Sequence, residues 1–180
     1  MAVQKKKLWR LLKKQAFFRR RVRLSSGKVS NYYIDVRRVS LTGEGISLIS
    51  HLIWDLIKDD KVTAIGGPTL GADPIIGGVC FLAYKKGKKL KGFIVRKIPK
   101  RHGRRKLIEG AALSSKDRVV LIDDVATTGS SLFKAIEILK KENIKIVKII
   151  VVVDRKEGAY QLFSNLGYPF VALFTRDDFL

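Results

Sequence analysis

The sequence predicts an α/β fold in which helices flank a mainly parallel central sheet. From about residue 62 onward, short continuous apolar runs alternate with stretches of helical periodicity. Such runs are typical of strands that are buried on both faces. Strands that alternate with helices are joined by right-handed crossovers, which makes neighbouring strands parallel. The 180 residues are enough for one compact domain with a substantial core.

The first third of the chain is expected to form a smaller addition to this core. It begins with leucines at helical spacing, continues through a turn-rich segment, SSGKVSN, and ends in a second amphipathic stretch. The elements expected here are helices over 3–17 and 42–57 and extended stretches over 21–24 and 32–36.

The core is expected to follow as a regular series of elements. Its strands are apolar and rich in valine and isoleucine, and its helices place apolar residues on one face. The first strand is expected to end where the segment GGP begins. The expected strands are 62–65, 92–96, 118–123, 145–154 and 170–175, and the expected helices are 72–84, 130–142 and 157–166.

Composition narrows the classes of protein that the chain can represent. Lys and Arg total 37 against 16 Asp and Glu, a formal charge of +21, but the basic residues are dispersed over many segments and are expected mostly on solvated faces. A single cysteine excludes an internal disulfide. Charged residues or glycine interrupt every long apolar run, so no membrane span is expected. We therefore expect a cytoplasmic protein.

The most informative segment is VVLIDDVATTGSS, residues 119–131. Its apolar half predicts a central strand, and two carboxylates follow at the end where open α/β sheets bind ligands. The small residues after them form a turn at a helix N-terminus, where backbone amides and the helix dipole favour a phosphate. Adjacent acids repel phosphate, so they are expected to face ribose hydroxyls or hydrated Mg²⁺. The alternative is an ordinary strand-to-helix turn in which these residues cap the helix.

This segment resembles the phosphoribosyl pyrophosphate motif of type I phosphoribosyltransferases. The resemblance implies the type I phosphoribosyltransferase fold, with a small N-terminal hood in residues 1–58 and the core in 59–180, all within one domain. It also implies that Asp123 and Asp124 hold the ribose hydroxyls. The 5-phosphate is then expected at Ala126, Thr127, Thr128, Gly129 and Ser130, with Val125 and Ser131 beside them.

A second segment, IVRKIPKRHGRRKLIEG, is similar to the mobile catalytic loop of orotate phosphoribosyltransferases, which carries an RKxxKxHG pattern. The resemblance implies a mobile loop over residues 97–110 that closes over the leaving pyrophosphate, where a dense set of cations stabilises growing negative charge and excludes water. Lys100 and His102 are the expected catalytic contacts, and Arg96 and Lys97 are expected to help bind pyrophosphate. The alternative is a solvated basic loop or a surface for RNA.

Two further segments resemble the parts of this family that select the base. RLSSGKVSNYYIDVR, residues 23–37, resembles the stretch that opens the hood, which implies orotate contacts around Ser25, Tyr33 and Ile34.

The other base-selecting segment is VVVDRKEGA, residues 151–159, which resembles the family's DRxEG segment. Its Arg155 would pair with the carboxylate of orotate, a bidentate contact that suits guanidinium. Thr127 would also face the base. The alternative for Arg155 is a salt bridge with Glu157 or Asp154.

The chain departs from the family pattern in the loop after the first core strand. Many members carry a Tyr-Lys pair there, whereas this loop reads GGPTLGADP and places Leu70 and Gly71 at those positions. Backbone amides of this loop are still expected to bind pyrophosphate, without a lysine contact. Asn31 stands where proline is frequent, a minor change.

Taken together, the resemblance implies an Mg²⁺-dependent orotate phosphoribosyltransferase. It would join orotate to the ribose 5-phosphate of phosphoribosyl pyrophosphate, with Mg²⁺ held mainly through the substrate. It also implies a homodimer with shared active sites. One alternative is a transferase for a purine base, which would leave Arg155 without a carboxylate partner. The other is a phosphoribosyl-pyrophosphate-sensing regulator that binds nucleic acid, but the sequence has no helix-turn-helix addition, so nucleic acid is not an expected partner.

Overall fold

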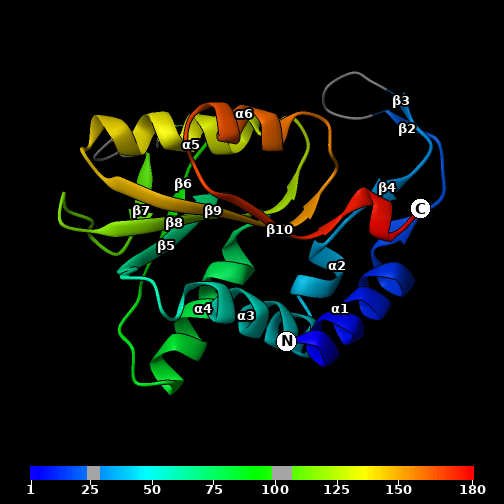
Figure 1. The fold of residues 1–180 in the computed structure, drawn as a ribbon, viewed down its shortest axis with the longest axis horizontal. Coiled ribbons are helices and arrows are strands. Elements are labelled where there is room, and N and C mark those ends of the chain that lie inside the picture. Colours follow the sequence, from blue (N-terminus) through cyan, green and yellow to red (C-terminus); the bar gives the residue numbers. More distant parts are fainter. Residues whose placement is uncertain (24–28, 99–106) are drawn as a thin grey trace.

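The structure, a computed structural model, describes residues 1–23, 29–98 and 107–180. Its centre is a six-stranded sheet in the order β10-β9-β8-β5-β6-β7. Five of these strands are parallel, and only β7 runs antiparallel, against β6. Helices α5 and α6 cover one face of the sheet and α3 and α4 the other (Figure 1). The predicted fold class, a mainly parallel sheet between helices, is therefore confirmed.

The elements follow the predicted alternation along the chain. The sheet strands are β5 (Ala64–Pro68), β6 (Lys91–Val95), β7 (Ile108–Gly110), β8 (Arg118–Ala126), β9 (Lys145–Asp154) and β10 (Phe170–Thr175). The helices are α1 (Ala2–Gln15), α2 (Arg37–Ser40), α3 (Gly43–Ile57), α4 (Asp73–Lys85), α5 (Ser130–Lys141), α6 (Ala159–Asn165) and the 3-10 turn η1 (Arg176–Asp178). Four short strands, β1 (Phe17–Phe18), β2 (Val22–Arg23), β3 (Val29–Ser30) and β4 (Tyr33–Ile34), pair as β1 with β4 and β2 with β3.

Strand β8 occupies the middle of the sheet and contributes to both halves of the core. Val120 and Ile122 point into the cluster shared with α1, α3 and α4, and Val119 and Leu121 point into the cluster under α5 and α6. All four are completely buried. A strand of this kind shows no polar alternation, which is why the sequence displays a continuous apolar run.

The order in which the chain adds strands to the sheet reverses between β7 and β8. The chain adds β6 on one side of β5, and then β8, β9 and β10 in turn on the other side. In open α/β sheets the crevice at the carboxyl ends of the strands, where this reversal occurs, is the usual ligand site. The topology therefore places the predicted phosphate turn, which follows β8, at that crevice.

The first core strand differs from the prediction, because the segment GGP lies inside β5 and not after it. A Cβ atom at Gly67 would lie 1.9 Å from the carbonyl oxygen of Ile122, so only glycine allows β5 to approach β8 this closely. The two glycines therefore serve strand packing, although glycine and proline usually indicate a turn.

Five short elements were not predicted. Strand β7 lies within the expected loop 97–110, β1 lies at the end of the expected helix 3–17, and β3 lies in the turn-rich segment SSGKVSN. The helix α2 and the turn η1 lie in stretches for which no helix was expected. Each of these elements has only two to four residues, too few to show a hydrophobic period of its own.

The N-terminal and C-terminal segments meet on one side of the molecule (Figure 1). Trp9 Nε1 donates a hydrogen bond to the carbonyl oxygen of Asp178 at 2.7 Å. Phe179 is only 1% exposed, and its ring lies 5.9 Å from that of Phe17 in β1. The last residues of the chain are thus part of the packing of the N-terminal region.

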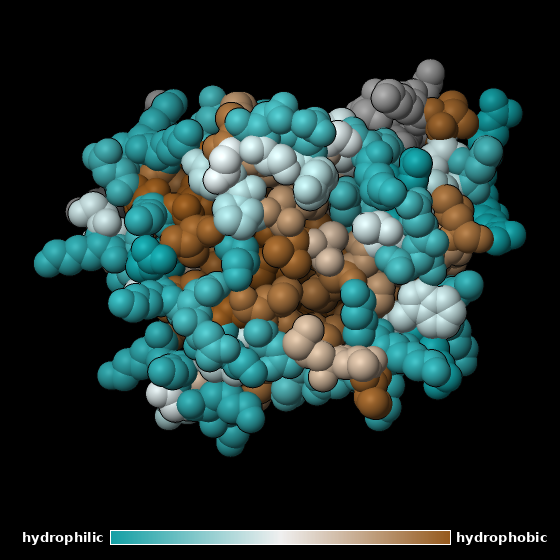
Figure 2. All heavy atoms as spheres, in the orientation of Figure 1, coloured by the Kyte–Doolittle hydropathy of each residue, from teal (hydrophilic) through white to brown (hydrophobic). Residues whose placement is uncertain are grey.

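The face shown in Figure 2 carries a concentration of apolar side chains over the edge of the sheet. The strand at that edge is β10, whose residues Val171 and Ala172 are only partly buried. In the described parts of the chain, no helix has both the length and the apolar character needed to cross a membrane.

Asp117 connects three strands at the opposite end of the sheet from the crevice. Its carboxylate accepts hydrogen bonds from Thr63 Oγ1 at 2.8 Å, from Lys91 Nζ at 2.9 Å and from the backbone N–H of Ser114 at 2.8 Å. Burial alone would raise the pKa of Asp117, but the hydrogen bonds from Lys91, Thr63 and Ser114 outweigh it and lower the pKa to about 2. The carboxylate therefore stabilises the fold in its ionised form.

We predict that Asp117→Asn lowers the free energy of unfolding near neutral pH by about 2 kcal/mol, because a shift of this size in the pKa of a buried carboxyl corresponds to that energy. A depressed pKa stabilises the folded state above the unfolded pKa, and the stabilisation disappears as pH falls from about 4 toward 2. Denaturant unfolding of both proteins at pH 7 and pH 3 measures this. If the difference in free energy of unfolding is the same at both pH values, the stabilisation does not come from the ionised carboxylate of Asp117. Asp59→Asn is the control, because Asp59 is exposed.

Candidate active site

Two adjoining hollows open at the carboxyl ends of β5 and β8. The first has a volume of about 600 Å³ and the second a volume of about 700 Å³, within the range of small-molecule sites. They share part of their walls, so they form one crevice with two arms. The shared residues are Pro68, Arg96, Lys97, Asp123, Val125 and Ser131.

Two carboxylates lie at the centre of this crevice. Asp123 is 9% exposed, and its Oδ1 accepts the backbone N–H of Asp124 at 2.9 Å. Asp124 Oδ1 accepts the backbone N–H of Val125 at 2.8 Å. Burial, together with repulsion from Asp124, raises the pKa of Asp123 well above its ordinary value, and burial also raises the pKa of Asp124. Hydroxyl donors or a cation placed against the pair would favour its ionised form.

The turn that follows the carboxylates forms the second arm of the crevice. Gly129 begins α5 in the left-handed conformation, with φ of +82°. The first turn of α5 contains no acidic residue, and no side chain of the described residues caps it. Its backbone N–H groups and the positive end of the helix dipole are thus directed at the wall lined by Thr127, Thr128 and Ser130, an arrangement suited to a phosphate group.

Cationic side chains lie on the other side of the carboxylates. Arg96 and Lys97, at the end of β6, line both arms of the crevice, and the positive charge of Lys97 opposes the rise in the pKa of Asp123. Arg37 lines the first arm, and its Nε donates to Asp35 Oδ1 at 2.8 Å. That hydrogen bond raises the pKa of Arg37. The crevice therefore pairs buried acids with cations that can face a polyphosphate.

The loop after β5 closes the first arm. Pro68, Thr69, Leu70 and Gly71 line it, and the peptide bond between Thr69 and Leu70 is cis. A Cβ atom at Gly71 would lie 2.1 Å from Asp124 Oδ1. Because Gly71 has no side chain, the Asp124 carboxylate can occupy this space.

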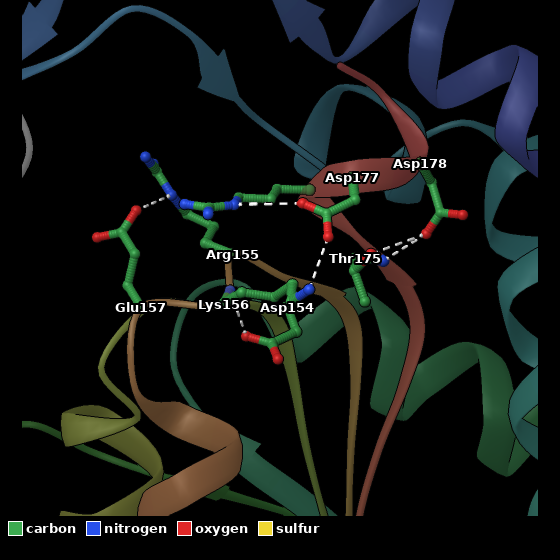
Figure 3. A network of polar contacts seen from close by, with 8 residues as sticks. Asp154, Arg155, Lys156, Glu157, Thr175, Asp177 and Asp178 are labelled. Carbon is green, nitrogen blue, oxygen red and sulfur yellow. Dashed lines mark hydrogen bonds and ion pairs between the residues drawn. The ribbon is translucent and has the colours of Figure 1, made fainter.

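Arg155 lies next to the crevice, in the loop between β9 and α6. Its backbone N–H donates to the carbonyl oxygen of Ala126 at 2.9 Å, which ties this loop to the phosphate turn. Figure 3 shows its guanidinium against Glu157, with a distance of 3.0 Å from Nε to Oε1. The ion pair with Glu157 that the sequence left open as an alternative is thus present. Arg155 is 4% exposed and lines neither arm of the crevice.

Most of the residues predicted for the site lie together around the crevice. Ser25, Lys100 and His102 lie outside the described residues, so their predicted roles remain predictions. The predicted residues that line the crevice are Tyr33, Ile34, Arg96, Lys97, Asp123, Asp124, Val125, Ala126, Thr127, Thr128, Gly129, Ser130 and Ser131.

Several residues that line the crevice were not predicted for the site. Asp35 and Arg37 in the first arm belong to the segment 23–37 that was assigned to base selection, and their alternating charges were a signal that could have identified them. The other unpredicted lining residues are Ile98 in the first arm and Val95, Leu107, Leu132, Lys134, Ala135, Glu137, Ile138 and Lys141 in the second.

A parallel sheet whose central strand ends in paired acids and a phosphate turn defines a phosphoribosyltransferase. The family model "Phosphoribosyl transferase domain" matches residues 43–162. The orotate phosphoribosyltransferase of Rhodopseudomonas palustris (strain TIE-1) is 37% identical over 174 residues, covering 94% of this chain and 92% of that protein. The chain belongs to the orotate phosphoribosyltransferase family.

Solved structures of that family have the same fold. The Mycobacterium tuberculosis H37Rv orotate phosphoribosyltransferase in complex with Fe(III) dicitrate superposes with a TM-score of 0.84 at 32% identity, covering 98% of both chains. The same enzyme in complex with phosphoribosyl pyrophosphate gives a TM-score of 0.81 at 30% identity, again with 98% coverage of both chains. The similarity includes the N-terminal residues that the family model leaves out.

We predict that Gly129→Ala weakens both the fold and donor binding. Alanine in the left-handed conformation costs about 1–2 kcal/mol, and its Cβ would lie 2.8 Å from the Phe163 ring. Thermal unfolding should show the loss of stability, and steady-state kinetics should show a higher KM for phosphoribosyl pyrophosphate. Gly43→Ala is the matched control, because a Cβ there meets nothing within 4 Å. Wild-type stability and KM in Gly129→Ala would refute this account of the turn.

Proposed function

We propose that this protein transfers ribose 5-phosphate from phosphoribosyl pyrophosphate to orotate, giving orotidine 5-phosphate and pyrophosphate in the formation of pyrimidine nucleotides. The observation that carries the proposal is the carboxylate pair of buried Asp123 and half-buried Asp124, which lies between an open phosphate turn and two cations. Family membership supports the same reaction. The bond between orotate N1 and ribose C1 forms as the bond from C1 to the pyrophosphate oxygen breaks. That oxygen keeps the electron pair, and the proton lost from N1 passes to water or to the departing pyrophosphate.

The two arms of the crevice divide the donor between them. The 5-phosphate binds at the start of α5, and the ribose hydroxyls donate to the carboxylate pair. Pyrophosphate lies toward the loop 69–71 and is bound by Arg96 and Lys97, which line the shared wall. Lys100 and His102 add catalytic contacts to the leaving group, a role that rests on their place in the RKxxKxHG pattern. Stabilising the charge that develops there lowers the barrier.

Orotate binds between the hood and the core. Tyr33 and Ile34 line the first arm, and Ser25 and Thr127 are the other proposed contacts. Arg155 binds the orotate carboxylate through the N–H groups that Glu157 does not occupy. Because Arg155 is almost fully buried, the carboxylate reaches it only after a local movement of the chain beside the guanidinium tip. A purine acceptor has no carboxylate to pair with Arg155, so this residue favours orotate over the purine alternative.

Mg²⁺ is part of the proposal, as a metal held mainly through the substrate. Within the described ranges, no group of three His, Cys, Asp or Glu side chains could hold a metal by itself. Asp123 and Asp124 fit a hydrated cation, because burial raises their pKa values and a cation would favour the ionised pair. When bound, Mg²⁺ would neutralise pyrophosphate charge and improve the leaving group.

We further propose a homodimer in which loop 97–110 of each subunit completes the partner's active site. The resemblance to the family implies this arrangement, and α4 offers a surface for it. Gly77, Phe81 and Tyr84 form one exposed stripe at spacings of four and three residues, and exposed Leu70 lies in the loop before the helix. The proposal also includes a cytoplasmic location, supported by the single cysteine, which leaves no internal disulfide that needs an oxidising compartment.

We predict that the protein consumes orotate only when phosphoribosyl pyrophosphate and Mg²⁺ are both present. The decrease in orotate absorbance measures this directly, with hypoxanthine and uracil as comparison acceptors. Arg155→Ala should lose most of the activity with orotate while still binding the donor, because the phosphate turn and the carboxylate pair are intact. Turnover of hypoxanthine without turnover of orotate would overturn the proposal.

We predict that two inactive variants restore activity when they share a dimer. Lys100→Ala removes a loop cation and Asp124→Asn removes a carboxylate, so each homodimer should be nearly inactive. If the loop acts in the partner's site, a mixed dimer holds one site with both groups intact. Co-expression with two different tags, purification of the mixed dimer and the orotate assay test this. A mixed dimer as inactive as its parents would show that the loop serves its own subunit or that no dimer forms.

A further inference from the structure

The guanidinium of Arg155 is positioned by an aromatic ring from the hood. Its Cζ lies 4.7 Å from the centroid of the Tyr32 ring, within the range of a cation–π contact. Nε donates to Glu157 at 3.0 Å, and Nη2 donates to Ser30 Oγ at 3.2 Å. A planar group held at its face and at one edge cannot turn freely, so its remaining N–H groups have a fixed direction.

Tyr32 is itself one of three stacked rings, which we call the aromatic column: Tyr32, Phe17 and Phe179. The rings of Tyr32 and Phe17 are 5.8 Å apart with an interplanar angle of 24°. Those of Phe17 and Phe179 are 5.9 Å apart with an angle of 17°. The three residues come from β1, from the segment before β4 and from the C-terminus, so the column joins the end of the chain to Arg155.

The C-terminal turn is fixed on its other side to the loop that carries Arg155. Lys156 Nζ donates to Asp177 Oδ2 at 2.6 Å, as Figure 3 shows. Asp178 Oδ2 accepts the backbone N–H of Thr175 at 2.7 Å, which closes the start of η1. The turn therefore contacts both the neighbour of Arg155 in the sequence and, through Phe179, the column beneath its guanidinium.

We propose that Tyr32 is a positioning residue for base recognition, and that the aromatic column makes the C-terminal turn part of the orotate site. The inference rests on the proposed function, since it takes Arg155 as the residue that binds the orotate carboxylate. Of the five guanidinium N–H groups, Nε–H and one on Nη2 are occupied by described residues. Those left lie at the tip, where Nη1 and Nη2 together can bind a carboxylate end-on.

The ring of Tyr32, and not its hydroxyl, carries this role. The hydroxyl oxygen is buried and has no hydrogen-bond partner among the described residues. Phenylalanine at this position would keep the stack and remove only an unpaired polar group, whose loss costs little. Leucine would keep apolar volume but remove the flat face on which the guanidinium lies. The two substitutions therefore separate positioning from simple packing.

The first test compares Tyr32→Leu with Tyr32→Phe. Tyr32→Leu should raise the KM for orotate about tenfold, the size of a desolvated cation–π contact, and leave the KM for phosphoribosyl pyrophosphate unchanged. Tyr32→Phe should keep both values within about twofold of the wild type. Equal rises in both KM values, or a wild-type orotate KM in Tyr32→Leu, would overturn the proposal.

A double-mutant cycle tests whether Tyr32 acts through Arg155. Tyr32→Leu should lower kcat/KM for orotate in the wild-type background and have almost no further effect in Arg155→Ala, because the positioned group is then absent. The same fold-change in both backgrounds would mean that Tyr32 acts independently of Arg155. If the wild type converts no orotate, the proposed function itself fails. If the wild type is active and Tyr32→Leu leaves the KM for orotate unchanged, only this inference is rejected.

Phe179→Leu provides a second variant at the far end of the column, should Tyr32→Leu fail to fold. It should raise the orotate KM in the same direction by a smaller factor, without changing the KM for phosphoribosyl pyrophosphate. Leu139→Ala is the matched control for lost stability, because Leu139 is completely buried and lines neither arm of the crevice. It should lower the unfolding temperature and keep both KM values. If Leu139→Ala changes the KM for orotate as much as Phe179→Leu does, the proposed role of the aromatic column in orotate binding is wrong.

Discussion

The burial of two adjacent carboxylates at the end of a central strand determines the electrostatics of the candidate site. Burial opposes the ionisation of both Asp123 and Asp124 at the carboxyl end of β8, and repulsion from Asp124 adds to that cost at Asp123. Ligand hydroxyls or a cation relieve that cost, so binding of the donor and ionisation of the pair are linked. Phosphate cannot bind against these acids, and the turn at the start of α5 offers it a separate place. In the proposed function, one pair of side chains thus separates the place of the ribose from that of its 5-phosphate.

The glycines beside this pair explain how the chain departs from the pattern of its relatives. A side chain at position 71 and the Asp124 carboxylate would occupy the same space, with 2.1 Å between a Cβ and Oδ1. A lysine at this position is therefore incompatible with the observed place of Asp124. Arg96 and Lys97, at the end of β6, line the same arm and are the cations that we propose for pyrophosphate.

The sequence was sufficient to predict the sheet and most of the crevice, because both depend on local patterns. The ranges 145–154 and 170–175 agree with β9 and β10, whose apolar runs are unambiguous, and the acids and phosphate turn are contiguous in the chain. Packing between distant segments was not predictable. The place of GGP inside β5 depends on its distance to β8, and β7 is a short strand paired only with β6. The contacts of Arg155 with Ser30 and Tyr32 join residues more than a hundred positions apart.

In the proposed function, base recognition depends more than donor binding on how two parts of the chain pack together. The proposed donor contacts follow β5, β6 and β8 of the core, and the hood residues Asp35 and Arg37 also line the first arm. Arg155 also belongs to the core, but its guanidinium lies on a hood ring that is stacked in turn on Phe17 and Phe179. We therefore propose that residues 1–58 and 59–180 act as one domain, as the shared hydrophobic cluster from Leu8 to Phe179 also supports. On this proposal, a change at Tyr32 in the hood alters the binding of the base, while the donor contacts made by the core stay in place.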